Sequence, residues 1–181
     1  MTTSDRRVWW VVGIGALLGG AVALLWPRSA FATTGGTMTL TQIQNLILDV
    51  FRGSGIPLWF AMANANLESA FNPNAHRGGN ESSWGLMQIN WNAHEAALRA
   101  RGIESPQELT DPLVNLTYWR DLVGRLASQE GATESGGIED WGRVRLRLAG
   151  VRRSAFGGAT AARILGRFRP VAARWLARGL Q

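Results

Sequence analysis

The chain has 181 residues, 46% of them hydrophobic, which suits one domain with a core and a short appendage. It contains no cysteine and only two histidines, which excludes a disulfide framework and argues against a zinc site, so we expect no metal and no cofactor. Its net charge is +6, and every basic residue is an arginine.

An apolar run comes first. Residues 8–26 carry no charge over 19 residues, and as a helix they would span roughly 28 Å, close to the hydrocarbon thickness of a bilayer. We expect residues 1–31 to be a signal-anchor or transmembrane segment that places the rest of the chain in the periplasm or outside the cell, or in a virion. The alternative is a secreted protein released by cleavage near Ala32, since Ala30-Phe31-Ala32 fits a cleavage site.

Two helices are predicted next. Residues 32–39 are rich in Thr and Gly and predict a flexible linker. Thr41 is the expected cap of a helix that buries one apolar face and ends at Gly53-Ser54-Gly55. A second helix is expected from Pro57, whose missing N–H is harmless in a first turn, again with one face inward.

Glu68 is expected in the last turn of this second helix. Phe71-Asn72-Pro73 should stop the helix, because the residue before a proline is pushed out of the α region. If Phe71, Trp84 and Met87 close over the Glu68 carboxyl, it loses solvent. Loss of solvent favours the protonated form, which is the form that a general acid needs.

The segment from Gly85 to Asn90 supplies the other half of a predicted site. Gly85 permits close approach of backbone, and Leu86 and Ile89 anchor the segment inward. Gln88 offers both a donor and an acceptor to a ligand. A carboxyl opposite an amide indicates a sugar-binding site.

These residues resemble a known family. Glu68-Ser69 with Phe71-Asn72-Pro73, followed by Gly85-Leu86-Met87-Gln88-Ile89, resembles the SLT-type lytic transglycosylase domain, a relative of goose-type lysozyme, over about residues 40–150. Leu109–Asn115 with Tyr118 resembles the segment that opens the family's next helix. The resemblance implies that Glu68 is the catalytic acid and base. We expect the substrate to be bound by Ser69, Trp84, Met87, Gln88, Asn90 and Tyr118.

Alternatives stay open for several of these residues. Ser69 is as able to turn the chain as to touch substrate, Gln88 can bond backbone, and Trp84 can stack on sugar or fill the core. Where the family shows Tyr-Asn-Ala-Gly, this chain has Arg147-Leu148-Ala149-Gly150, so an aromatic hydroxyl near the acid is missing or comes from Tyr118. Glu81 is a second candidate carboxylate, although an exposed loop charge is the simpler interpretation.

Further helices complete a fold that we expect to be mainly α, a lysozyme-like helical domain behind the N-terminal segment. They are predicted at residues 91–101, 112–126, 138–148 and 159–180, the last kinked at Pro170. We place a lytic transglycosylase domain at residues 40–155 and an Arg-rich amphipathic C-terminal helix at residues 156–181.

The C-terminal segment is strongly basic. Residues 141–181 hold ten arginines and no acidic residue. Such a segment suits anionic lipids, acidic wall polymers or nucleic acid, although a solvated face of ordinary helices is the preferred interpretation. Nucleic acid is the weakest of these partners because no binding motif accompanies the arginines.

Three functions follow. The first is a membrane-tethered lytic transglycosylase that cleaves peptidoglycan between N-acetylmuramic acid and N-acetylglucosamine with a 1,6-anhydro product, opening the wall for a phage or an envelope-spanning secretion machine. The resemblance implies that Glu68 alone carries both proton transfers. The second is a hydrolytic goose-type muramidase in which Glu81 or Asp111 positions a water. The third is a non-catalytic glycan-binding assembly component.

Overall fold

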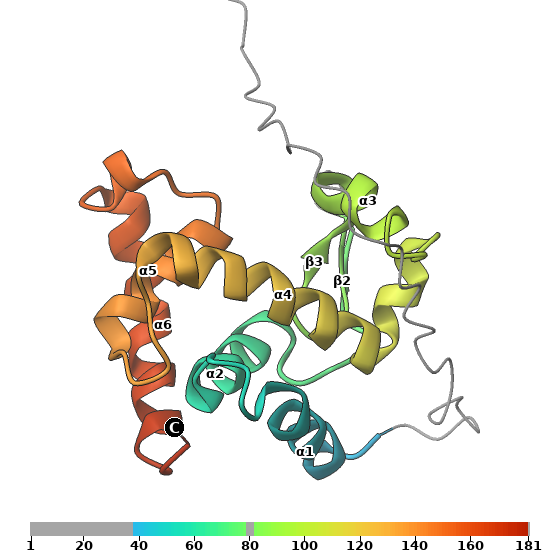
Figure 1. Ribbon diagram of the computed structural model, residues 1–181, viewed down its shortest axis with the longest axis horizontal. Helices are drawn as coiled ribbons and strands as arrows, with labels where there is room; N and C mark the ends of the chain where they lie inside the picture. The colour runs from blue at the N-terminus through green and yellow to red at the C-terminus, as the bar shows by residue number, and fades with distance from the viewer. Residues whose placement is uncertain (1–37, 79–81, 181) are drawn as a thin grey trace, which may run out of the picture. The chain divides into compact units, whose positions relative to one another are not determined.

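The structure is a computed structural model that describes residues 38–78 and 82–180 (Figure 1). The predicted N-terminal segment, almost all of the predicted linker, and Glu81 lie outside the described residues. Within the described ranges, no helix has the length and apolar character needed to cross a bilayer.

The described residues are mainly helical, as predicted. The elements are α1 (Leu40–Phe51), α2 (Leu58–Ser69), β1 (His76–Arg77), β2 (Ser83–Trp84), β3 (Ile89–Asn90), α3 (Trp91–Arg99), the 3-10 helix η1 (Pro106–Thr110), α4 (Pro112–Glu130), α5 (Ile138–Leu148), the 3-10 helix η2 (Arg153–Ala155) and α6 (Ala159–Leu176). The predicted helices after residue 90 are therefore all present, with ends within a few residues of those expected.

Helix α1 begins earlier than predicted. Its cap is Thr39 and not Thr41, because the Thr39 hydroxyl accepts the Gln42 N–H at 3.2 Å while the Gln42 side chain accepts the Thr39 N–H at 2.8 Å. This reciprocal pair satisfies two N–H groups that a helix start leaves free. The helix then buries Ile43, Ile47 and Phe51.

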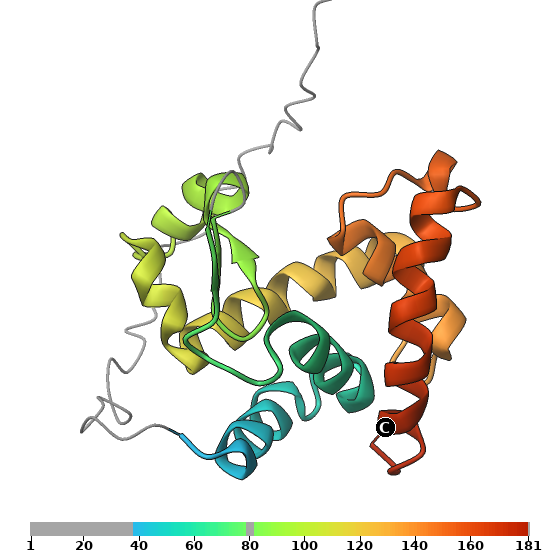
Figure 2. The ribbon, with the colours of Figure 1, turned by 180° about the vertical axis from the view of Figure 1, so that it is seen from behind.

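Helix α2 is the central helix of the described chain. The prediction that it buries only one face was wrong, since every residue from Trp59 to Ala65 is buried. It packs against α1 and α6 (Figures 1 and 2). The Phe60 ring lies 5.9 Å from Trp119 of α4, 4.6 Å from Trp141 of α5 and 5.7 Å from Phe168 of α6, centroid to centroid. Phe60 therefore joins four helices in one core.

Helix α6 shares this core. Phe168 is fully buried, and the Trp59 N–H of α2 donates to the Leu180 carbonyl just beyond α6 at 3.2 Å. The helix runs from Ala159 to Leu176 through Pro170. The sequence analysis placed a boundary between residues 155 and 156. Helix α6, which follows this boundary, packs into the same core as the helices that precede it.

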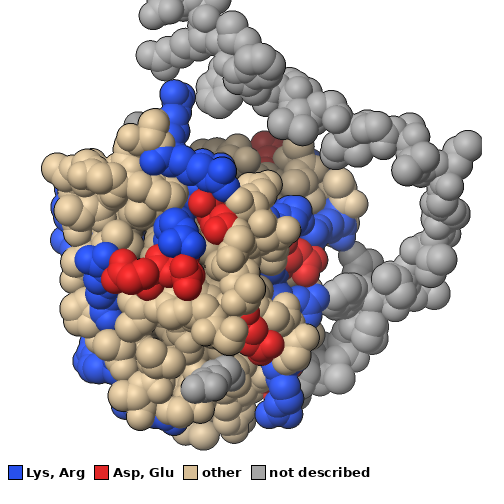
Figure 3. All heavy atoms as spheres, turned by 60° about the vertical axis from the view of Figure 1, so that its left-hand side comes forward, with Lys and Arg blue, Asp and Glu red and all other residues tan. Residues whose placement is uncertain are grey.

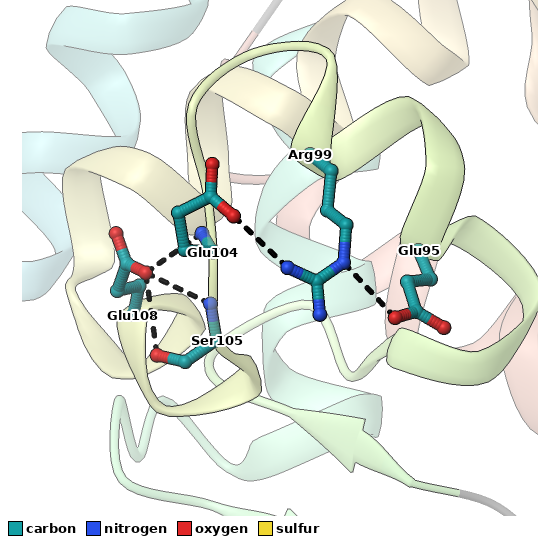
Figure 4. Close-up of polar contacts among 5 residues, drawn as sticks. All are labelled: Glu95, Arg99, Glu104, Ser105 and Glu108. Atoms are coloured by element: carbon teal, nitrogen blue, oxygen red, sulfur yellow. Dashed lines mark hydrogen bonds and ion pairs between the residues drawn. The ribbon is translucent and has the colours of Figure 1, made fainter.

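The chain between α2 and α4 forms a small sheet and a turn. The strands, which the sequence did not predict, pair antiparallel in the order β1-β2-β3. In the turn that follows, Glu108 accepts the backbone N–H groups of Glu104 and Ser105 at 2.8 and 2.9 Å, and Arg99 bridges Glu95 and Glu104 (Figure 4). These contacts fix η1, which leads directly into the start of α4.

Candidate active site

Glu68 lies in the last turn of α2, as predicted, but the helix ends by a different device. Ala70 and Phe71 both adopt the left-handed conformation, with φ of 52° and 64°. The N–H groups of Ala70 and Phe71 donate to the carbonyls of Asn66 and Ala65 at 3.1 and 3.3 Å. The chain therefore reverses directly after Ser69, before Pro73 takes effect.

The left-handed Ala70 gives a stability prediction. A Cβ is sterically strained in this conformation, which destabilises the folded state, whereas glycine has no such strain. Ala70→Gly should therefore raise the free energy of unfolding by about 0.5–1 kcal/mol in denaturant titrations. Ala100 is a matched control, because it is also an exposed helix C-cap but has φ of −61°. There the same substitution should lower stability, and equal effects at both positions would contradict the strain argument.

A guanidinium faces Glu68. Arg145 Nη2 of α5 lies 2.5 Å from Glu68 Oε1, and the two side chains are only 17% and 19% exposed. The residues expected to close over the carboxyl have other neighbours. The Phe71 ring packs on Trp175 of α6 at 5.8 Å, and the Trp84 ring stacks on His76 at 3.7 Å. The sequence did not predict this partner of Glu68: the carboxyl belongs to a mostly buried ion pair.

Within the part of the chain that the structure describes, two polar atoms on this ion pair and its helix have no hydrogen-bond partner. Arg145 Nε is buried without one, and so is Asn64 Oδ1, on α2 one turn before Glu68. The Asn64 amide nitrogen, in contrast, donates to the Phe60 carbonyl at 2.8 Å. Buried polar groups are almost always paired with protein or water, so the unpaired Nε of Arg145, whose Nη2 contacts Glu68, is a candidate partner for water or a ligand.

The second motif forms a tight loop that depends on Gly85. Its φ is +75°, and a Cβ at this position would collide with the Leu109 carbonyl oxygen and the Asn115 amide. Gln88 is also left-handed, with φ of 48°, and its Nε2 donates to the carbonyls of Ala75 and Gly85 at 3.0 Å each. The amide nitrogen of Gln88 thus holds the loop closed, and a substrate contact of this side chain stays a prediction.

Asn115 of α4 clamps this loop from below and was missed as a positioning residue. It is fully buried, its Oδ1 accepts the Met87 N–H at 2.9 Å, and its Nδ2 donates to the carbonyls of Trp84 and Leu109 at 2.9 and 3.0 Å. The available signal was an asparagine one turn into an otherwise apolar helix face, where a buried amide must find partners.

Tyr118 does not hydrogen-bond Glu68. Its hydroxyl lies 3.0 Å from His94 Nδ1, and burial raises the pKa of the Tyr118 hydroxyl. Burial, together with the nearby charge of Arg125, lowers the pKa of His94 below its ordinary 6.5. A neutral imidazole accepts from the tyrosine O–H, so the two residues form a neutral pair that ties α3 to α4.

The His94 environment makes stability depend on pH. Because the folded state disfavours the charged imidazole, the unfolded chain takes up a proton first as the pH falls below 6.5. This contribution to stability is fully present above pH 6.5 and is lost below it, with a slope of up to about 1.4 kcal/mol per pH unit. Denaturant titrations between pH 7 and 5 should show the loss in the wild type and a flatter profile in His94→Gln. Parallel profiles would contradict the assignment.

The remaining predicted substrate residues are placed around the loop. Ser69 Oγ donates to the Ala65 carbonyl at 3.1 Å, and the Asn90 side chain caps α3 by accepting the Ala93 N–H at 3.0 Å. Met87 is buried at 3% exposure, and Trp84 is half-buried. Their contacts with a sugar stay predictions.

Arg145 is the α5 residue that contacts the Glu68 carboxylate. It lies two positions before Arg147, which aligns with the first residue of the family's Tyr-Asn-Ala-Gly motif. Arg147 Nε instead lies 3.4 Å from Glu130 Oε1 at the end of α4. No group of three or more His, Cys, Asp or Glu within the described ranges is placed to hold a metal ion.

Comparison with known proteins gives one match. A family model described as Transglycosylase SLT domain matches residues 51–133, a shorter range than the predicted 40–155. The matched range contains Glu68, Gly85–Asn90 and Asn115, and it ends before α5, so Arg145 lies outside it. No curated protein and no solved structure matches the chain significantly.

Proposed function

We propose, from the premise that residues 51–133 are a transglycosylase SLT domain, that this chain cleaves the bond between N-acetylmuramic acid and N-acetylglucosamine in peptidoglycan, with Glu68 as acid and base. The family match supports a glycan-cleaving role. The position of Glu68, at the end of a central helix and mostly enclosed, supports its part in that role.

Among the described residues, the placement of Asp111 favours a lyase over a hydrolase. Hydrolytic glycosidases normally use two carboxyl groups. Asp111, the described candidate for the second, is exposed and caps α4, where its Oδ1 accepts the N–H groups of Leu113 and Val114 at 2.8 and 3.1 Å. A single carboxyl suffices when the substrate supplies its own nucleophile.

In the proposed reaction, protonated Glu68 donates its proton to the glycosidic oxygen as the bond to the muramic C1 breaks. The 2-acetamido group of the muramic ring stabilises the positive charge that develops there. Ionised Glu68 then takes the proton of the 6-hydroxyl as its oxygen bonds to C1, giving a 1,6-anhydro ring. Glu68 is protonated again at the end of the reaction, and no water is consumed.

Arg145 has two parts in this scheme. An ion pair requires an ionised Glu68, whereas the first step requires a protonated one. The arriving sugar must therefore separate the two side chains, and the carboxylate must take up a proton from solvent, before the glycosidic bond breaks. The buried Arg145 Nε, which has no partner in the described chain, is a donor available to a sugar oxygen. Arg145 therefore holds the empty site in shape and turns to the substrate when the site fills.

Product mass tests the reaction type. Purified peptidoglycan digested with the full chain should release fragments whose muramic ends are one water lighter than those made by a hydrolytic muramidase. Fragments with ordinary reducing ends would show hydrolysis and redirect the assignment to a goose-type muramidase.

Arg145→Ala should lower kcat by about 10-fold or more and raise KM, because it removes both the contact that positions Glu68 and a substrate donor. Arg143→Ala is the matched control, since Arg143 lies on the same helix in an exposed ion pair with Asp140 at 2.8 Å. Equal kinetics for the two variants would contradict a role for Arg145.

One observation favours a second candidate function. A carboxylate neutralised by a neighbouring arginine is also what a non-catalytic glycan-binding component would retain, because the pair then only stabilises the fold. That function predicts binding of glycan without release of fragments.

For the cellular role, we propose local opening of the wall for an envelope-spanning machine or a phage, from an N-terminal anchor that keeps the domain outside the cytoplasm. The uncharged run at residues 8–26 supports the anchor. An alkaline-phosphatase fusion at the C-terminus tests the topology: activity supports export, and its absence contradicts it.

A further inference from the structure

The solvent-exposed half of α6 presents arginines aligned along the helix. Arg163, Arg167 and Arg174, called here the arginine stripe, are all exposed and follow one another at intervals of four and seven residues. These intervals place them within about 40° of one another around the helix and over roughly 17 Å along its axis. They therefore point to the same side.

The other exposed residues on this half of α6 mostly have short side chains. Its other exposed residues between 162 and 177, apart from Arg169, are small or lack a long side chain: Ala162, Gly166, Pro170, Ala173 and Ala177. No acidic residue follows Asp140 in the sequence. The arginine side chains thus rise above a smooth ridge that a flat surface can approach closely.

The stripe is free of internal charge partners within residues 38–78 and 82–180. The acidic residues nearest in sequence are engaged elsewhere, since Glu139 pairs with Arg169 at 2.6 Å and Asp140 with Arg143 at 2.8 Å. Figure 3 shows one face of the molecule, on which acidic groups lie beside basic groups. The stripe's charge is therefore available to an external anion.

We propose that the arginine stripe docks onto the surface of an anionic lipid bilayer. The sequence keeps a bilayer within reach, because the uncharged run ends at Trp26 and the described chain begins at Met38. Twelve residue steps extend to at most about 40 Å, so an inserted run would hold the domain next to lipid headgroups.

The chemistry favours lipid over other polyanions. A straight row of guanidinium groups on a smooth helix suits a flat array of phosphates, and each arginine held at an anionic surface strengthens binding by roughly fivefold. Binding to single-stranded nucleic acid would want exposed aromatic rings for stacking, whereas the aromatic residues of α6, Phe168 and Trp175, are buried.

Docking through α6 would also orient the proposed active site. Helices α6 and α2 pack directly on one another, and α2 ends at the carboxylate of Glu68. A bilayer contact at the stripe therefore fixes the direction in which this site faces the wall. Lipid docking rests on the arginine stripe and on the uncharged run at residues 8–26, and it does not require the chain to cleave glycan.

The experiment uses the full chain in vesicles of neutral phosphatidylcholine or of phosphatidylcholine with phosphatidylglycerol. The chain has no cysteine, so Ala173→Cys places a single fluorophore on the exposed half of α6, and Ser128→Cys places one on the exposed side of α4. Energy transfer from a fluorophore at position 173 to a headgroup-labelled lipid should be at least about twofold higher in anionic vesicles than in neutral ones. Transfer from position 128 should not differ between the two kinds of vesicle. The excess should vanish in 0.5 M salt, which shortens the screening length to a few ångströms.

Charge-matched variants decide the result. Combining Arg163→Gln, Arg167→Gln and Arg174→Gln should reduce transfer to the neutral-vesicle value. Combining Arg52→Gln, Arg99→Gln and Arg125→Gln removes the same charge from α1, α3 and α4 and should leave transfer unchanged. Equal transfer in neutral and anionic vesicles, or equal losses in the two triple variants, overturns the proposal. Stripe-dependent binding to vesicle-free wall polymer without any lipid effect also overturns it.

Discussion

Replacing Glu68 by Gln should abolish release of fragments from purified peptidoglycan, with the rate falling by about 10³-fold. The amide keeps the size of the side chain and can still accept from Arg145, so the fold should survive. It can neither give a proton to the glycosidic oxygen nor take one from the 6-hydroxyl. Because the proposed scheme uses this one group twice, both steps fail together.

Glu104→Gln is the control for this loss. Glu104 is an exposed carboxylate that pairs with Arg99 at 2.9 Å, far along the chain from the proposed site, and its variant should digest peptidoglycan like the wild type. Unfolding midpoints measured for both variants separate lost chemistry from lost structure. A folded Glu68→Gln variant that digests within a few-fold of the wild type would leave glycan binding as the surviving function.

Asn115→Ala should give the largest loss of stability, about 4 kcal/mol, because it removes three buried hydrogen bonds at once. The Met87 N–H and the carbonyls of Trp84 and Leu109 would then lose this partner inside the protein. The loop from Gly85 to Gln88 rests on those contacts, so glycan cleavage should fall as well. Chemical denaturation measures the first effect and fragment release the second.

Asn45→Ala provides the comparison for this prediction, since Asn45 is exposed on α1. It should change stability by less than about 0.5 kcal/mol. A loss below 1 kcal/mol in Asn115→Ala would show that the loop holds its shape without the clamp.

Local sequence signals predicted the helices well. Pro57 and the glycines after α1 and α3 bracketed their elements, because capping and chain reversal depend on neighbours in sequence, whereas α2 ends at the left-handed Ala70 just before the expected proline stop. Where two local signals competed, the choice was sometimes wrong: Thr39 and Thr41 each have a Gln three residues later, and it is Thr39 that forms the capping box with Gln42. The place of Glu68 in the last turn of α2 followed from the same local rules.

Contacts between distant segments were harder to predict. Arg145 meets Glu68 across 77 positions of sequence, and the family motif directed attention to Arg147 instead. Both arginines lie on α5, and only the rotation of that helix against α2 decides which one faces the carboxylate. Similarly, the sequence suggested that the Tyr118 hydroxyl lies near Glu68. In the structure this hydroxyl instead contacts His94 of α3.

The ion pair refines the proposed chemistry. Because the Glu68 carboxylate contacts the Arg145 guanidinium, a bound sugar must displace this contact before the carboxyl can reach the glycosidic oxygen. The proposed cleavage would then depend on occupancy of the site.

The most direct test is a crystal structure of the Glu68→Gln variant with a tetrasaccharide of alternating N-acetylglucosamine and N-acetylmuramic acid. The account predicts that the glycosidic oxygen lies within about 3.2 Å of the side-chain amide at position 68, with Arg145 turned toward the sugar. A tetrasaccharide bound away from position 68, with Arg145 still against that side chain, would contradict it.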